Sequence, residues 1–160
     1  MKSHEAVSMS AIARVRRDRR RTWFVDDEPT AEIPLLGSLV REPAHTVTEQ
    51  EPLGVAQRIL IERRVPAVAV VRGEQLCGVV TRTDVLRLVA TRDDARIADA
   101  MSGFVFALRA SATVEAAAAL MAIEQVGQVV VTSRDGELLG MVSALDVARY
   151  FAERAGYVSK

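Results

Sequence analysis

The sequence has little of several things that other classes of protein need. Cys77 is its only cysteine, so no disulfide forms within one chain, which favours a reducing compartment. Aromatic residues make up 4% of the chain, so Val, Leu, Ile and Ala must supply most of the core. The formal net charge is zero at pH 7, which predicts no general attraction to nucleic acid or to an anionic membrane surface.

Patterns of the common enzyme and membrane classes are also missing. No apolar run approaches the roughly 20 residues of a membrane-spanning helix, and the residues after Met1 lack the apolar stretch of a signal peptide. Neither the G-x-x-x-x-G-K-[ST] loop nor G-x-G-x-x-G occurs. The two histidines, His4 and His45, have no cysteine or carboxylate at catalytic or metal-ligand spacing. We expect a cytoplasmic protein with no enzyme activity, no catalytic residue and no metal site.

What the sequence does contain is an internal repeat. GVVTRTDVL at residues 78–86 returns as GMVSALDVA at 140–148, and the likeness extends in both directions. Leu36 aligns with Ile97 at a shift of sixty-one residues, which becomes sixty-two after one inserted residue near Thr132. The repeat predicts an N-terminal arm that is partly ordered at 1–33, a first repeat at 34–93, a second at 94–155 and a tail at 156–160.

Both repeats predict the same order of elements, β-α-β-β-α. A short extended segment precedes a helix, which is opened by Pro52 in one copy and Thr113 in the other. A buried strand, a turn and a second strand then form a hairpin, and a last helix follows the hydroxyl residue. About sixty residues bury too small a core on their own. The predicted fold is therefore α/β (α+β), with the two repeats packed as a pseudo-two-fold pair.

The repeated motif places a hydroxyl three residues before an aspartate, at Thr81–Asp84 and Ser143–Asp146, where a strand becomes a helix. One interpretation is structural, because this spacing is a helix-capping pattern. The other is functional, because a helix N-terminus and a hydroxyl can hold a phosphate. A carboxylate beside them would repel phosphate but can accept bonds from a sugar diol. The motif thus suits ribose joined to phosphate.

The complete repeat resembles the CBS domain, named after cystathionine β-synthase, over residues 34–155. That family has tandem pairs, and the resemblance implies a regulatory module that senses AMP, ADP, ATP or S-adenosylmethionine between its repeats. The Thr or Ser of the motif would contact phosphate, the Asp would contact ribose, and the apolar-Pro-apolar strand would lie near adenine. Carried over by position, one site comprises Thr81, Asp84, Thr46, Val65, Pro66 and Ala67, and the other comprises Ser143, Asp146, Leu108, Val126 and Gln128.

The two copies differ in ways that affect this interpretation. The second copy has Gly127 where the first has Pro66, which loosens the backbone near the expected base. Arg82 follows Thr81 and can meet a polyphosphate or remain an ordinary surface arginine, whereas Ala144 stands at the equivalent position. We therefore favour the Thr81 site for a charged nucleotide.

Partners are predicted less directly. The resemblance implies a homodimer formed through helical faces, and a client protein of unknown identity is expected to receive the change in shape. A ligand-free interaction scaffold is the main alternative. The arm contains RVRRDRRR, which raises nucleic-acid binding as a third hypothesis, but DDEPTAE follows and nearly balances the charge, so nucleic acid is disfavoured. Within the arm, TWFV at 22–25 is expected to dock on an apolar surface.

Overall fold

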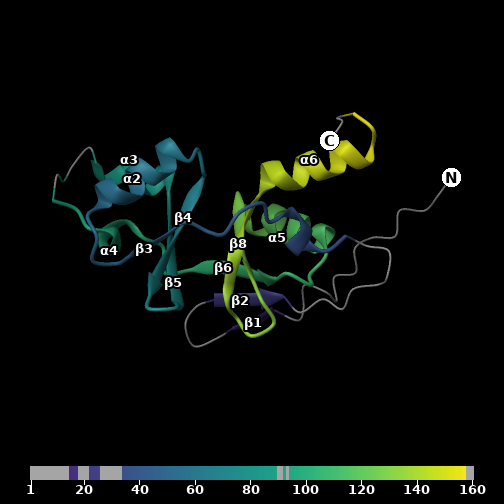
Figure 1. Ribbon diagram of the computed structural model, residues 1–160, viewed down its shortest axis with the longest axis horizontal. Coiled ribbons are helices and arrows are strands. Elements are labelled where there is room, and N and C mark those ends of the chain that lie inside the picture. Colours follow the sequence, from purple (N-terminus) through teal and green to yellow (C-terminus); the bar gives the residue numbers. More distant parts are fainter. Residues whose placement is uncertain (1–14, 18–21, 26–33, 90–91, 93, 158–160) are drawn as a thin grey trace.

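The structure, a computed structural model, describes residues 15–17, 22–25, 34–89, 92 and 94–157 of the 160 (Figure 1). Two lobes lie side by side, each with helices packed against its own sheet (Figure 1). Each repeat forms a short helix, a strand, a helix, a hairpin and a last helix, which confirms the predicted α/β class and the two-repeat organisation. The short first helix of each repeat was not predicted.

The two repeats give matching elements. The first contains η1 (Leu36–Leu39), β3 (Thr46–Thr48), α2 (Leu53–Glu62), β4 (Ala67–Arg72), β5 (Gln75–Thr81) and α3 (Arg82–Val89). The second contains α4 (Ile97–Ala100), β6 (Val105–Arg109), α5 (Val114–Glu124), β7 (Gln128–Thr132), β8 (Leu138–Ser143) and α6 (Ala144–Arg154). In both sheets the first strand of the repeat is parallel to the second, and the second is antiparallel to the third.

Local sequence explains how the central helices begin and end. α5 starts after Thr113, whose side chain accepts a hydrogen bond from the Ala116 N–H, as a good N-cap does. α2 starts after Pro52, where a missing backbone N–H does no harm. Both helices end close to a residue in the left-handed conformation, Arg64 and Gln125, each with φ of 55°. The two helix ends are thus built alike, although neither uses glycine.

The short first helices pack on the opposite repeat. Leu36 of η1 is fully buried in the core formed by α5, β7 and β8, and Ile97 of α4 is fully buried in the core formed by α2, β4 and β5. The Leu36 N–H donates to the Ala112 carbonyl at 2.7 Å, and the Ile97 N–H donates to the Glu51 carbonyl at 3.0 Å. Because the segments are exchanged reciprocally, the two cores hold each other together.

The repeated glycines make this exchange possible. A side chain at Gly78 would come within 2.7 Å of the Ser102 carbonyl, and one at Gly140 would overlap the side chain of Val40. Each glycine thus lies where the segment after an exchanged helix crosses a strand of the other repeat. Close backbone approach is the role that glycine within a strand is expected to have, and it accounts for the first residue of the repeated motif.

The arm adds two strands to the second sheet. β2 (Thr22–Val25), the TWFV segment, runs parallel to β6, and β1 (Val15–Arg17) pairs with β2, which gives the order β1-β2-β6-β7-β8. Among the described residues, the first sheet comprises β3-β4-β5. The rest of the arm, including Arg19–Arg21, lies outside the described residues. In the part of the chain that the structure describes, no helix is long and apolar enough to cross a membrane.

Candidate functional site

Both copies of the repeated motif form the same capping box. Ser143 ends β8, and its backbone N–H donates to Asp146 Oδ2 at 2.9 Å, while the Asp146 N–H donates to Ser143 Oγ at 3.2 Å. Thr81 and Asp84 repeat these bonds at 2.9 and 3.3 Å at the start of α3. The structural interpretation of the motif is therefore realised in both copies.

This capping arrangement also constrains what a ligand can do. The hydroxyl of Ser143 donates its only proton to Asp146 Oδ2. A phosphate that accepts this proton would leave Asp146 Oδ2 with the backbone N–H as its donor. Asp146 Oδ1 lies 3.7 Å from Nη1 of Arg149. A ligand that took this proton would therefore rearrange the hydrogen bonds of the cap.

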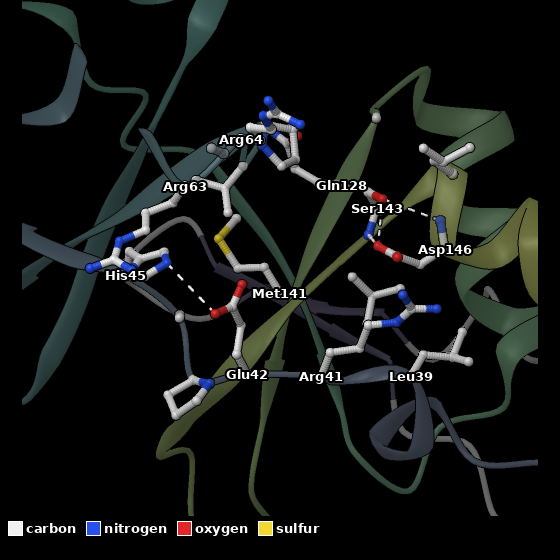
Figure 2. Close-up of a pocket in the computed structure, with 18 of the residues that line it drawn as sticks. Leu39, Arg41, Glu42, His45, Arg63, Arg64, Gln128, Met141, Ser143 and Asp146 are labelled. Carbon is white, nitrogen blue, oxygen red and sulfur yellow. Dashed lines mark hydrogen bonds and ion pairs between the residues drawn. The ribbon is translucent and has the colours of Figure 1, made fainter. Parts of the chain in front are cut away.

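The larger of two clefts lies beside Ser143 and Asp146 and has a volume of about 530 Å³ (Figure 2). Met141 of β8 lies at its centre, with Ser143 and Asp146 on one side and His45 and Arg63 on the other (Figure 2). Both repeats line it, and its wall comprises Leu39, Arg41, Glu42, Pro43, Ala44, His45, Arg63, Arg64, Val65, Pro66, Ala67, Arg82, Gly127, Gln128, Met141, Val142, Ser143, Leu145 and Asp146. Its volume falls within the range of about 300–1,000 Å³ typical of small-molecule sites.

The smaller cleft lies beside Thr81 and has a volume of about 270 Å³. Phe104 and Phe106 line it, with their ring centroids 4.8 Å apart in an edge-to-face arrangement. Its other lining residues are Val79, Thr81, Ser102, Val105, Val126, Gly127, Gln128, Val130 and Met141. None of these carries a charge, and the volume falls below the usual range for a drug-sized ligand.

The structure groups the predicted site residues differently from the sequence. Ala67 pairs with Thr81 across β4 and β5, as expected, yet Val65, Pro66 and Ala67 also line the larger cleft together with Ser143 and Asp146. The strand β4 that follows Pro66 runs beside β5, but the wall built by 65–67 turns toward the other repeat. Four other predicted residues also line a cleft: Arg82 lines the larger one, Gln128 lines both, and Thr81 and Val126 line the smaller one.

Three predicted site residues line neither cleft. Leu108 is fully buried in the core of the second lobe, so its side chain offers no surface to a ligand. Thr46 is exposed on β3, away from the lining of both clefts. Asp84 is half-buried and is occupied by the capping box with Thr81. Position within a repeat did not reveal these placements, because it does not show which face of a strand is buried or which side chain is already hydrogen-bonded.

Sequence reasoning missed three arginines of the larger cleft, Arg41, Arg63 and Arg64. Figure 2 shows Arg64 beside Gln128 along one edge and Arg41 along the opposite edge. The repeat alignment carried a signal that could have found them. The residues that align with these three in the second repeat are Ser102, Glu124 and Gln125, none of which is basic.

His45 is the one histidine among the described residues, and it lines the larger cleft. Its Nε2 lies 4.0 Å from Oε2 of Glu42 and has no hydrogen-bond partner in the described part of the chain. Nowhere among the described residues do three His, Cys, Asp or Glu side chains gather as a metal ion would require. The polar groups that the cleft presents are thus arginine, imidazole, hydroxyl, amide and carboxylate groups.

The CBS domain family model matches the chain twice, at residues 36–91 and 97–153. The chain belongs to the CBS domain family. Inosine-5'-monophosphate dehydrogenase of Korarchaeum cryptofilum is 30% identical to this CBS chain over 102 residues, which are 64% of the chain and 21% of that protein. The chain therefore spans about a fifth of the length of this curated relative.

Solved structures share the fold of this CBS pair. The CBS domain pair of protein MJ0100, in complex with 5'-methylthioadenosine and S-adenosyl-L-methionine, superposes with a TM-score of 0.70 at 22% identity, over 76% of this chain and 98% of that chain. CBS domain protein PAE2072 from Pyrobaculum aerophilum, complexed with AMP, gives a TM-score of 0.69 at 22% identity, over 77% and 97%. The resemblance found in the sequence is thus confirmed at the level of family and fold.

Proposed function

We propose that this chain is a non-enzymatic regulatory module that binds an adenosine nucleotide in its larger cleft. The observation that carries the proposal is the meeting of Val65, Pro66 and Ala67 of the first repeat with Ser143 and Asp146 of the second around one cleft of about 530 Å³. Relatives of the same fold were solved with AMP or S-adenosyl-L-methionine, which supports the choice of adenosine.

Each group of the cleft has a role in this proposal. The apolar wall at Val65–Ala67 packs against the base, and the carboxylate of Asp146 accepts hydrogen bonds from the ribose hydroxyls. Ser143 and the start of the eleven-residue α6 meet the first phosphate, where the helix dipole favours negative charge. The smaller cleft, beside Thr81, has no charged lining group and no equivalent space.

Binding becomes a signal because both repeats line the cleft. A ligand that touches both favours one relative placement of the lobes, and its effect equals its differential affinity for the two placements. We propose that a client protein in the cytoplasm reads this change. The chain is further proposed to act as a homodimer through its helices, because Ile61, Leu86 and Leu145 are between 66% and 74% exposed on α2, α3 and α6. Light scattering after size-exclusion chromatography measures the dimer.

A matched pair of variants tests the proposed site by isothermal titration with AMP, S-adenosylmethionine and, as a base control, GMP. Asp146→Ala and Asp84→Ala remove the same capping box from equivalent helices, so their effects on stability are alike. We expect Asp146→Ala to lose adenosine binding and Asp84→Ala to keep the wild-type affinity. Equal losses would contradict the assignment to the larger cleft, and no binding by the wild-type chain would favour the scaffold with helix caps only.

A further inference from the structure

We infer that the larger cleft selects adenosine nucleotides with two or three phosphates over AMP and S-adenosylmethionine, and that each chain holds one such nucleotide. This inference rests on the proposed function and names the ligand class of that site. The feature that carries it is a set of four arginines on the wall of the cleft: Arg41, Arg63, Arg64 and Arg82.

The four guanidinium groups form no ion pair with a carboxylate in the part of the chain that the structure describes. Among the described residues, no carboxylate lies within 4.0 Å of any of them, although Arg72, Arg92 and Arg149 of the same chain do have such partners. All four residues are exposed, so they keep their donors available to a ligand. Arginine binds phosphate oxygens through two parallel hydrogen bonds, which makes it the residue type suited to a polyphosphate.

Comparison with the second repeat shows that the fold does not require arginine at two of these positions. Arg64 and Gln125 share the same left-handed backbone, so the fold does not require arginine at this helix end. The same holds at the start of the last helix, where Arg82 and Ala144 each donate a backbone N–H to a carbonyl before the partner strand. A cation at a helix N-terminus opposes the helix dipole, so Arg82 is placed there at some expense of stability.

Charge balance decides between the possible adenosine ligands. Two carboxylates, Glu42 and Asp146, also line the cleft, so the four arginines leave it with an excess of positive charge. S-adenosylmethionine carries a positive sulfonium group, which this excess repels. Ser143 and the start of α6 meet one phosphate. A second and third phosphate bring the negative charge that neutralises the remaining arginines.

The test is a titration series of adenosine, AMP, ADP, ATP and S-adenosylmethionine into the full chain without divalent cations. We expect ATP and ADP to bind at least about tenfold more tightly than AMP, because each charge-assisted hydrogen bond contributes at about that level. Arg63→Gln with Arg64→Gln should abolish this preference and leave the affinity for adenosine unchanged. Arg134→Gln, on the turn between β7 and β8, is the control for loss of charge outside the cleft.

The outcomes separate this inference from the proposed function. AMP and ATP binding equally, with Asp146→Ala abolishing both, would overturn the polyphosphate preference and keep the nucleotide site. Two ATP molecules per chain would overturn the assignment of a single site. An equal effect of Arg134→Gln and the double variant would overturn the role of the cleft arginines. No binding of any adenosine compound would overturn both proposals.

Discussion

The two clefts of this CBS pair share one backbone plan and differ in their walls. In each, a strand ends in a hydroxyl residue, Ser143 or Thr81, which caps the next helix together with an aspartate three residues on. The larger cleft then adds four arginines and open space of about 530 Å³. The smaller one adds Phe104 and Phe106 and leaves about 270 Å³.

This difference shows which part of the repeat the fold requires. The motif has the same structural role in both copies: its glycine allows close backbone approach, and its hydroxyl and aspartate cap a helix. Ligand binding is therefore not needed to explain why the motif is repeated. Several aligned positions that differ lie on a cleft wall: His45 of the larger cleft aligns with Phe106 of the smaller one, and Arg41 of the larger cleft aligns with Ser102 of the smaller one. Function is therefore better sought where the two repeats disagree.

The largest effect is expected on ATP affinity, when the arginines of the larger cleft are replaced by the residues that align with them in the second repeat. Replacing Arg41, Arg63 and Arg64 by Ser, Glu and Gln gives the larger cleft the residues that the second repeat has. ATP affinity should fall by at least about 100-fold, because several charge-assisted bonds are lost and a carboxylate is added. Isothermal titration measures the loss. ATP binding at the wild-type affinity would show that the phosphates lie elsewhere.

A smaller effect on stability is expected at the two glycines. Alanine should lower the free energy of unfolding by about 3 kcal/mol at Gly78 and about 1 kcal/mol at Gly140. The added carbon at Gly78 would lie 2.7 Å from the backbone carbonyl of Ser102, which accepts a hydrogen bond from the Val79 N–H. At Gly140 the clash is with the side chain of Val40, and the backbone carbonyl of Glu42 lies farther away, at 3.1 Å. Urea unfolding of the two variants measures the difference, and the reverse order would contradict this account of the exchanged segments.

The capping residues should give equal and modest losses. Thr81→Ala and Ser143→Ala each remove one acceptor for a backbone N–H at the start of a helix. We expect each to lower the free energy of unfolding by about 1 kcal/mol. Only Ser143→Ala should also weaken nucleotide binding. Equal effects of the two substitutions on binding would mean that both clefts take ligand.

The smallest effect concerns Cys77, which aligns with Leu139 of the second repeat. Partial burial raises the pKa of the Cys77 thiol, the carboxylate of Glu49 raises it further, and the thiol donates to the Val70 carbonyl at 3.3 Å. The folded chain should therefore react with a thiol reagent at pH 8 more slowly than the urea-unfolded chain. Because its pKa is higher in the folded chain than in the unfolded chain, the Cys77 thiol stabilises the fold below pH 9, and this stabilisation is lost as the pH rises further. Equal reaction rates would show that the thiol is not protected.

Much of the fold followed from the sequence because local patterns determine it. Alternating buried strands, turn residues and helix starts gave the order of elements in each repeat, and the repeat itself predicted the pair. The short helices at 36–39 and 97–100 were missed because four residues carry no readable periodicity. Their exchange between the lobes is a tertiary contact, for which the glycines at 78 and 140 were the available sign.

Most residues predicted for the two sites do line a cleft, but the sequence did not show which of them line the same cleft. Ser143, Asp146, Val65, Pro66, Ala67, Gln128 and Arg82 all line the larger cleft. Their assignment to two sites followed position along the chain, whereas the cleft forms between repeats. Leu108 was placed in a site by alignment, yet alternation along β6 turns its side chain into the core. Whether one strand residue is buried depends on the elements that pack against that face of the sheet, and the sequence of the strand alone does not show which elements these are.

The central claim is that one cleft, and not its symmetric partner, holds the nucleotide. A crystal structure of the full chain grown with ATP tests it most directly. The account predicts one ATP per chain, with its ribose at Asp146 and its outer phosphates at Arg63 and Arg64. A nucleotide bound beside Thr81 and Phe106, or two clefts that stay empty at saturating ATP, would contradict it.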